Sequence, residues 1–320
     1  MSFKKLRYNL LVIGLIALIC CYIGMTFLFT DAPMDINQGN IQDNTDDNVG
    51  DEELNEDGNN DEPPADVVIP TNAIELIQYG LDIIANGNGY TSTFNTTIVN
   101  EAVGVSAVQY VDGKVSRGVN SQGEKVSVEE NYYHSSESGV AAGMVANFFK
   151  GFYINEETGL TQVATTSDYD ADAQTYNLAN ADINKTVATA DALNEYKILQ
   201  GQGFPIDITK TNCIISQDDT SNKNVRIITV KITNFSSLSQ YFLDFFTSTG
   251  QMENINYSSI VIKFTINKNN GYITKVQRTE NFSATAVNVP VLGSVTVNVE
   301  ATTIQSFKNM NQEVVLADSL

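Results

Sequence analysis

The sequence has no tryptophan, one histidine, three cysteines and only 18 basic residues against 38 acidic ones. The formal net charge of −20 excludes nucleic-acid binding, because that binding needs lysine and arginine to displace counterions from phosphates. Three cysteines exclude a scaffold built on disulfides. With His134 as the single histidine, a zinc site that uses two imidazoles cannot form within one chain.

Patterns typical of catalysis are also absent. The chain has no Gly-x-Ser-x-Gly elbow, no phosphate-binding loop and, beyond residue 30, no Cys-x-x-Cys pair. Cys213 is the only cysteine beyond residue 30, and we expect it to be a buried apolar residue. We expect His134 to be a surface or strand-edge residue rather than a general base. The sequence therefore predicts no enzyme, no catalytic residues and no cofactor.

The N-terminal segment predicts a membrane anchor at residues 10–30. Twenty consecutive residues from Leu10 to Phe29 carry no charge, which is the length that a helix needs to cross the hydrocarbon core. Three basic residues precede this run, so residues 1–9 are expected to be cytoplasmic. This predicts a single-pass protein of the plasma membrane with an extracellular C-terminal domain. A cleaved signal peptide and a lipoprotein are the alternatives.

Residues 31–66 predict a disordered acidic linker. They contain thirteen acidic residues, no basic residue and little apolar surface to offset the entropy of ordering a backbone. Repulsion between like charges extends such a chain, so the linker would hold the following domain away from the bilayer. Calcium binding at residues 46–51 is the alternative, but the ligand spacing of an EF-hand is missing.

Residues 67–320 have the composition of an extracytoplasmic globular domain that begins with a helix. Asn72 and Glu75 form a possible capping box, and residues 86–87 provide a stop. Apolar residues on one face recur at steps of three and four: Ile74, Ile77, Leu81 and Ile84.

Strand patterns follow the helix. Residues 103–109 and 115–119 alternate around Asp112-Gly113, which predicts a hairpin turn there. Residues 260–266 and 272–278 flank Asn270-Gly271, a second turn signal. With 282–289 and 295–301 they predict an antiparallel meander of four strands.

Three more segments predict helices, at residues 131–152, 182–199 and 236–250. The predicted fold class is therefore α+β: after the transmembrane helix and the disordered stalk, a curved antiparallel sheet resembling a half-barrel has helices packed on one face. Met144, Phe148 and Phe149 of the first segment are candidates for a lid over an apolar cavity, and a core helix is the alternative interpretation.

Asp168-Tyr169-Asp170-Ala171-Asp172 has alternating carboxylates that could converge on calcium. Ala173 and Ala179 occupy the positions where an EF-hand loop needs glycine and glutamate. We therefore predict a solvated acidic loop and no metal site.

The element order and the terminal segment 307–315 resemble LolA- and LppX-type half-barrel lipoprotein and lipid-carrier domains. The resemblance covers residues 72–119 and 236–315. In that family the concave face of the sheet holds acyl chains. The resemblance implies a ligand-binding wall made of Phe242, Phe245, Phe246, Ile260, Ile262, Phe264 and Ile266, for which a simple packed core is the alternative interpretation.

Together these patterns predict a membrane-anchored extracytoplasmic domain that binds a lipid or another hydrophobic ligand without catalysis. The expected partners are the bilayer, through residues 10–30, and the apolar ligand. The alternative is a cell-surface interaction or envelope-structural module with no small-molecule ligand, which would show a packed interior and an exposed apolar patch.

Overall fold

The computed structural model describes residues 68–102, 104–135, 147–170, 175–188, 208–235, 252–289 and 293–320, together with residues 190 and 193. The predicted anchor at residues 10–30 and the predicted linker at residues 31–66 lie outside these ranges. Among the described residues, none of the helical segments has the length and hydropathy of a transmembrane span.

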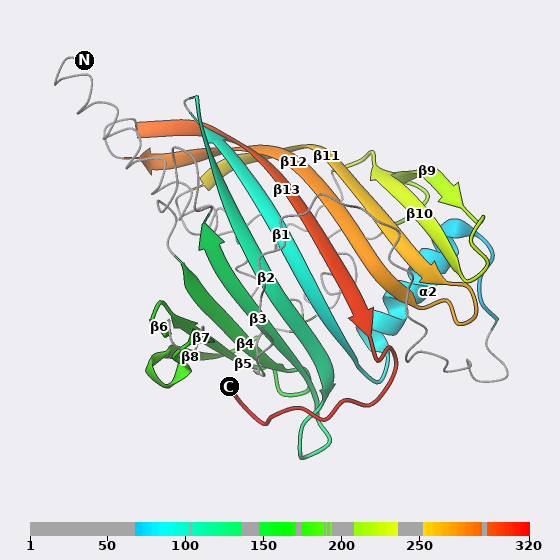
Figure 1. The fold of residues 1–320 in the computed structure, drawn as a ribbon, viewed down its shortest axis with the longest axis horizontal. Coiled ribbons are helices and arrows are strands. Elements are labelled where there is room, and N and C mark those ends of the chain that lie inside the picture. The colour runs from blue at the N-terminus through cyan, green and yellow to red at the C-terminus, as the bar shows by residue number, and fades with distance from the viewer. Residues whose placement is uncertain are drawn as a thin grey trace.

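One antiparallel sheet dominates the structure (Figure 1). Its eleven strands lie in the order β8-β5-β4-β3-β2-β1-β13-β12-β11-β10-β9, and β6 and β7 form a separate small hairpin. The elements are α2 (Ala73–Asn86), β1 (Tyr90–Ala102), β2 (Val105–Val119), β3 (Lys125–Ser135), β4 (Phe148–Asn155), β5 (Leu160–Thr166), β6 (Tyr169–Asp170), β7 (Thr175–Tyr176), the 3₁₀ turn η1 (Leu178–Asn180), β8 (Asp182–Val187), β9 (Cys213–Asp219), β10 (Val225–Ile232), β11 (Met252–Asn267), β12 (Ile273–Val289) and β13 (Gly293–Lys308).

The predicted α+β class with several helices packed on one face is wrong. In the described part of the chain α2 is the one α-helix with defined bounds, and the sheet accounts for most of the ordered backbone. Residues predicted as helix at 131–152 contribute the end of β3 and most of β4, and β8 replaces the start of the helix predicted at 182–199. The helix predicted at 236–250 lies outside the described residues.

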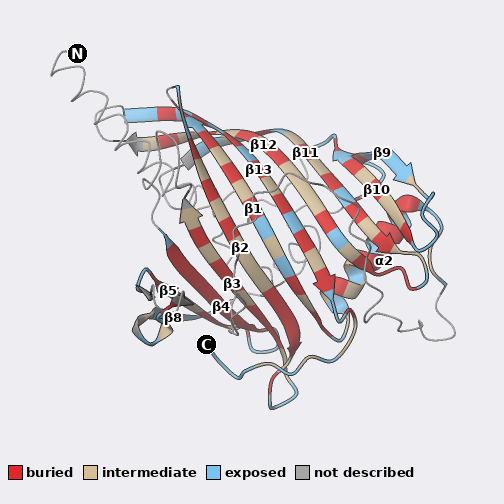
Figure 2. Ribbon diagram, in the orientation of Figure 1, coloured by how far each residue is buried: buried red, intermediate tan, exposed pale blue. Residues whose placement is uncertain are grey.

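Burial on both faces explains why the sequence of β4 predicts a helix. All eight of its residues are buried, so no alternation of polar and apolar residues marks the strand (Figure 2). Phe149 pairs with Tyr132 and Phe148 pairs with Tyr133 in the ladder to β3. A short run that is apolar throughout cannot be assigned by periodicity, and its aromatic residues favour a strand.

The predicted turn at Asn270-Gly271 is confirmed, and the turn predicted at Asp112-Gly113 is wrong. Gly271 has φ +73° in the connection between β11 and β12. By contrast β2 runs without interruption through Gly113, where a Cβ atom would overlap the ring of Phe94 on β1. Glycine is required there for close packing of a ring, and the turn lies at Gly104, with φ +76°.

The antiparallel pairing of the predicted meander is confirmed, but the meander has three strands instead of four. The segments 272–278 and 282–289 belong to the single strand β12, which pairs with β11 on one side and β13 on the other. Strands of sixteen or seventeen residues extend about 50 Å at about 3.3 Å per residue. A hydrophobic core on one face supports this length.

The predicted first helix is confirmed. The side chain of Asn72 accepts hydrogen bonds from the backbone N–H of Ile74 at 3.0 Å and of Glu75 at 3.3 Å. Ile77 and Ile84 are fully buried against the sheet. We call the sheet face that carries α2 the inner face. On β13 the odd-numbered residues from Val295 to Phe307 are buried on this face, and their neighbours point to the outer face.

The chain after β13 crosses the outer face of the sheet at β2, β3 and β4. Two backbone hydrogen bonds join this tail to β2. The N–H of Val119 donates to the carbonyl of Val314, and the N–H of Leu316 donates to the carbonyl of Val119, both at 2.8 Å. Leu316 and Leu320 then pack against a second apolar cluster, which contains Val126, Val128, Phe149, Tyr153 and Tyr176. The sheet therefore has apolar residues on both faces at β3 and β4.

Candidate functional site

Four of the seven residues of the predicted ligand wall lie in the part of the chain that the structure describes. Ile260, Ile262, Phe264 and Ile266 lie on β11, point to the inner face and have no exposed surface. They belong to one large apolar cluster that also contains the buried face of α2. Phe242, Phe245 and Phe246 lie outside the described residues. The role of this set in ligand binding stays a prediction.

The predicted lid residues do not share a helix face. Phe148 and Phe149 are neighbours on β4 and point to opposite faces of the sheet. The Phe148 ring stacks on Tyr133 with centroids 4.1 Å apart, whereas the Phe149 ring contacts Tyr132 on the outer face. Met144 lies outside the described residues, and the lid role stays a prediction.

Helix α2 covers only one end of the inner face. The middle of α2 packs closely on β12, where a Cβ atom at Gly80 would overlap the side chain of Ile273. Near the C-terminus of the helix, the carbonyl of Ile84 accepts a hydrogen bond from Arg117 on β2. A helix is about 10–12 Å wide, against strands about 50 Å long. We call the part of the inner face beyond α2 the far half; at its β4 end Leu193, a helical residue, packs against Phe152 and Ile154.

The far half carries a row of buried polar side chains across β1, β2 and β3. We call Asn100, Gln109, Tyr133 and Asn131 the polar strip. Each has at most 1% of its surface exposed. Asn100 lies opposite Ala107, two residues from Gln109, and Tyr133 lies opposite Val111, again two residues from Gln109. Neighbours at such diagonal positions are about 7–8 Å apart, so the strip is continuous.

Most polar atoms of the strip have no hydrogen-bond partner among the described residues. This holds for both amide atoms of Asn100, both amide atoms of Gln109, the hydroxyl of Tyr133 and the Oδ1 of Asn131. A buried polar atom without a partner costs about 1–3 kcal/mol, and native interiors contain few of them. Such a concentration on one sheet face is typical of a site that a polar group completes.

Glu129 and Lys150 border the polar strip on the same face. The Nδ2 of Asn131 donates to Oε1 of Glu129 at 2.9 Å, and Lys150 pairs with Asn131 in the β3–β4 ladder. Burial raises the pKa of Glu129 to about 7, an effect that the bond from Asn131 and the charge of Lys150 oppose. Burial, with Glu129 nearby, also raises the pKa of the Tyr133 hydroxyl, which therefore stays protonated and able to donate.

The raised pKa of Glu129 predicts a pH dependence of stability. Between pH 4.5 and about 7 the folded chain holds a proton that the unfolded chain releases. The stabilisation is therefore complete below pH 4.5 and is lost as the pH rises through 7. Raising the pH from 5 to 8 should lower the unfolding free energy of the natural chain by about 2 kcal/mol relative to Glu129→Gln. Urea titrations of both chains at the two pH values measure this; equal changes would contradict it.

The arginines on the inner face are paired with carboxylates. Arg117 forms a bidentate salt bridge with Glu156, in which Nε donates to Oε1 at 2.6 Å and Nη2 donates to Oε2 at 2.7 Å; both side chains are 3% exposed. Arg278 is paired with Glu280, two residues along β12. Arg226 on β10 is paired with Asp218, and Lys150 lies beside Glu129. Each of these four cations faces a carboxylate, so they offer no excess of positive charge to an anionic ligand.

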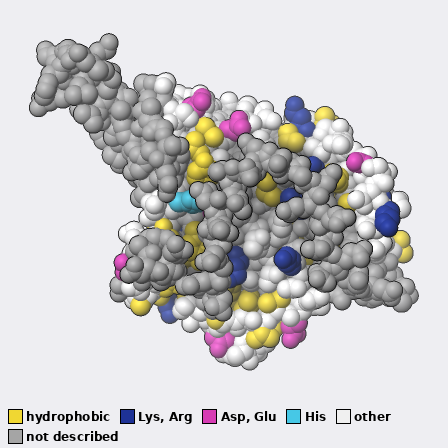
Figure 3. Space-filling model, in the orientation of Figure 1, with side chains coloured by type: hydrophobic (Ala, Val, Ile, Leu, Met, Phe, Trp, Pro, Cys, Tyr) yellow, Lys and Arg dark blue, Asp and Glu magenta, His cyan; other side chains and the backbone are white. Residues whose placement is uncertain are grey.

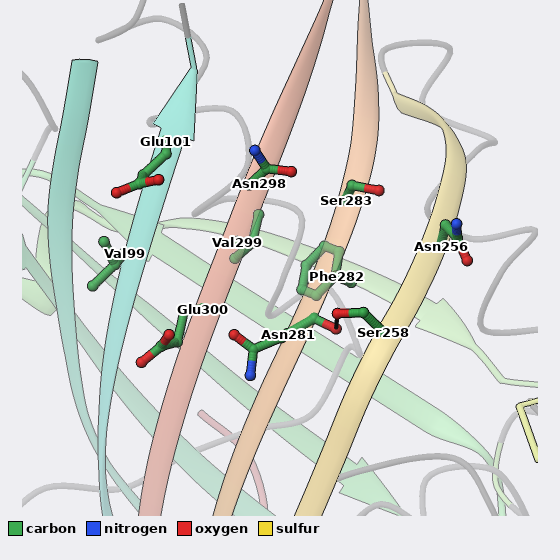
Figure 4. A pocket seen from close by; sticks show the side chains of 10 residues that line it. All are labelled: Val99, Glu101, Asn256, Ser258, Asn281, Phe282, Ser283, Asn298, Val299 and Glu300. Carbon is green, nitrogen blue, oxygen red and sulfur yellow. Dashed lines mark hydrogen bonds between the residues drawn. The ribbon is translucent and has the colours of Figure 1, made fainter. Parts of the chain in front are cut away.

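A polar groove lies on the outer face. Its volume is about 420 Å³, and Figure 4 shows its side chains arising from four adjacent strands, β1, β13, β12 and β11. The lining consists of Val99, Glu101, Asn256, Ser258, Asn281, Ser283, Asn298 and Glu300, together with Phe282 and Val299, which belong to the inner-face cluster and also border the groove. Most of these side chains are polar and two are acidic, so the groove does not suit an apolar ligand.

The remaining candidates lie outside the polar strip. His134 is on the outer face of β3, where its Nε2 lies 2.9 Å from Oδ2 of Asp112, in agreement with a strand-edge or surface histidine. Cys213 is buried as expected. Asp168 contacts Asn177 beside the small β6–β7 hairpin. In the described part of the chain no group of three histidine, cysteine or acidic residues could hold a metal ion.

The polar strip was missed in the sequence because single asparagine and glutamine residues carry no motif. A detectable signal did exist. Asn100 and Gln109 occupy positions whose neighbours two residues away, Ile98, Ala102 and Val111, are apolar and face the core. A polar residue in the inward register of a strand is unusual enough to mark a position for attention.

Compared with protein-family models and with curated proteins, the sequence shows no match. Comparison with solved structures finds a DUF1329 family protein from Desulfovibrio piger, at 10% identity over 77% of this chain and 93% of that one, with TM-score 0.23. The LolA superfamily protein NE2245 from Nitrosomonas europaea has 9% identity over 78% and 96% of the two chains, with TM-score 0.22.

A putative outer membrane lipoprotein-sorting protein domain from Vibrio parahaemolyticus has 9% identity over 72% of this chain and 93% of that one, with TM-score 0.21. At such TM-scores these structures carry no argument about activity or ligand. The chain is weakly similar to LolA-type proteins, as its element order predicted.

Proposed function

We propose that this chain binds a lipid or another largely apolar ligand on the far half of the inner face, without catalysis. One observation carries the proposal: buried polar atoms without partners stand directly beside apolar side chains of the same face. A filled core of this size would exclude such atoms, whereas a ligand pocket is mostly apolar with a few polar groups that orient the ligand.

The apolar part of the proposed site is extensive. Beyond α2 the inner face includes Ile260, Phe282, Val297 and Ile98 from four neighbouring strands, all in the large apolar cluster. On the side of the molecule drawn in Figure 3, the acidic and basic side chains of the described residues are scattered and form no broad field of one sign. The arginines of the inner face are paired with carboxylates. Apolar contact rather than charge therefore favours the ligand.

The test uses the full-length chain, purified without added lipid and analysed by native mass spectrometry and solvent extraction. We expect a stoichiometric lipid or similarly apolar molecule that is released on unfolding. Ala284 and Ser283 are adjacent on β12 but point to the inner and outer faces respectively. Ala284→Phe should reduce the bound amount about tenfold by filling the inner face, and Ser283→Phe should leave it unchanged.

Circular dichroism of both variants verifies that they fold. A folded natural chain with no bound molecule would overturn the proposal. Equal loss in both variants, or loss in Ser283→Phe alone, would also contradict it, and would instead indicate the polar groove of the outer face.

An interaction module is the second candidate, favoured by the edges of the sheet. On the edge strand β9 Ile214 and Ile215 are exposed, and on the edge strand β8 Ile183 and Val187 are exposed. Exposed edge strands pair readily with another chain. A chain that carries no lipid but self-associates or captures a strand-forming peptide would favour this function.

A further inference from the structure

We propose that the polar strip binds an uncharged head group rich in hydroxyl groups, such as a glycosyl or glycerol group, on a ligand whose apolar part occupies the rest of the far half. This inference rests on the proposed function and adds the chemical class of the ligand. It is carried by the identity of the unpartnered groups and by the charge balance around them.

The unpartnered groups can both donate and accept hydrogen bonds. The amides of Asn100 and Gln109 each have two N–H donors and one acceptor oxygen, and the Tyr133 hydroxyl donates and accepts. Hydroxyl groups of a sugar or of glycerol also do both, so several of them in a row match this alternation. A carboxylate or phosphate could use only the donors and would leave the Oδ1 of Asn100 and the Oε1 of Gln109 unsatisfied.

The charges beside the strip favour a neutral group. Lys150 is the cation nearest to the strip in the ladder, and it also faces Glu129 and the ring of Phe152, whose centroid is 4.6 Å from its Nζ. Phosphate recognition uses arginine or lysine that is available to the anion. The three arginines on the inner face, Arg117, Arg278 and Arg226, are paired with Glu156, Glu280 and Asp218 respectively.

The geometry orients the ligand along the sheet. The strip crosses β1, β2 and β3, whereas Phe282, Val297 and Ile260 lie on β12, β13 and β11. Because β13 pairs with β1, the apolar and polar parts meet there, where Asn100 lies opposite Val299. A ligand with its head group over β1–β3 and its chain over β13–β11 satisfies both parts of the face.

The experiment compares two lipids with the same dioleoylglycerol body, a neutral monoglycosyl lipid and the anionic phosphatidic acid, which has no hydroxyl-rich head group. The full-length chain, stripped of bound lipid, is equilibrated with equal amounts of both in mixed micelles and analysed by native mass spectrometry. We expect the glycosyl lipid to be preferred at least about tenfold, because two or more hydrogen bonds differ between the lipids.

The variant Asn100→Leu/Gln109→Leu should lose this preference while keeping its affinity for the acyl chains. Its stability should be equal or higher, because apolar groups of similar size replace unsatisfied polar ones. Asn298→Leu, on the outer face of β13, is the matched control and should keep the preference. Tyr133→Phe keeps the stacking on Phe148 and removes one hydroxyl, so it tests the strip if the double variant does not fold.

The outcomes separate the two proposals. Equal binding of both lipids by the natural chain, or a preference that the double variant retains, would overturn the head-group inference and leave the proposed function standing. Absence of binding to either lipid would overturn both. Loss of stability in the double variant with no change in preference would show that the strip is satisfied by internal water and has a structural role only.

Discussion

Replacing Arg117 with methionine should lower the free energy of unfolding by about 3–5 kcal/mol, because the change leaves a buried carboxylate without its partner. The guanidinium of Arg117 donates to both carboxylate oxygens of Glu156 and also to the carbonyls of Ile84 and Gly87, at 3.3 and 3.2 Å. One side chain therefore joins β2, the end of α2 and the turn that follows β4. Chemical denaturation monitored by circular dichroism measures the loss.

The double variant Arg117→Met/Glu156→Met separates the cost of an unpaired charge from the value of the pair. Because both charges are removed, the double variant should be clearly more stable than Arg117→Met alone. Ser127, whose hydroxyl donates to Glu156 at 2.9 Å, would lose one acceptor, which is a small effect. If the double variant were as unstable as the single one, the carbonyls of α2 rather than Glu156 would be the important partners.

Replacing Phe264 with alanine should lower the free energy of unfolding by about 3–5 kcal/mol. Phe264 has no exposed surface, lies opposite Ile228 on β10 and Val276 on β12, and belongs to the same cluster as α2. Removal of the ring leaves a cavity that close-packed neighbours cannot fill. Thermal and urea unfolding of the variant measure the effect.

The control for this prediction is Ile304→Ala on the outer face of β13, where 37% of the side chain is exposed. That change should cost less than about 1 kcal/mol. A loss at Phe264 as small as that at Ile304 would show that the ring lines a ligand space instead of the packed core. In that case the predicted role of Phe264 in the ligand wall would gain support.

The parts of the fold that the sequence predicted correctly depend on local signals. Asn72 marks the start of α2, since its side chain satisfies N–H groups that any helix leaves free at its first turn. Asn270-Gly271 marks the β11–β12 turn, because glycine adopts positive φ without strain. The alternation in β13 follows from one inner and one outer face.

The incorrect predictions, at β4 and at Gly113, concern residues whose structure depends on tertiary packing and not on the local sequence pattern. In β4 both faces are covered, so its aromatic residues show no period of two, and the local pattern predicts a helix. Gly113 resembles a turn residue in the sequence, but its lack of a side chain makes space for Phe94 on the neighbouring strand. Both features depend on residues distant in the sequence, which no local pattern contains.

The candidate site also has one part that the sequence predicted and one part that it did not. The apolar side chains of β11 were predicted from their alternation, which persists in the structure. The polar strip was not predicted, because Asn100, Gln109 and Tyr133 come from three strands and acquire significance only when their registers place them together. Their lack of partners depends on burial, which the sequence does not contain.

By itself, the sequence determined the acidic character of the chain, the position of the first helix, the antiparallel meander and the absence of a histidine-pair zinc site. These follow from composition, capping and alternation, which act over a few residues. Tertiary structure alone decided that β4 is a strand and that residues 182–187 form β8 in one sheet of eleven strands instead of the start of a helix. It also assembled the polar strip, since strand register and burial arise from hydrogen bonds and packing between segments far apart in the chain.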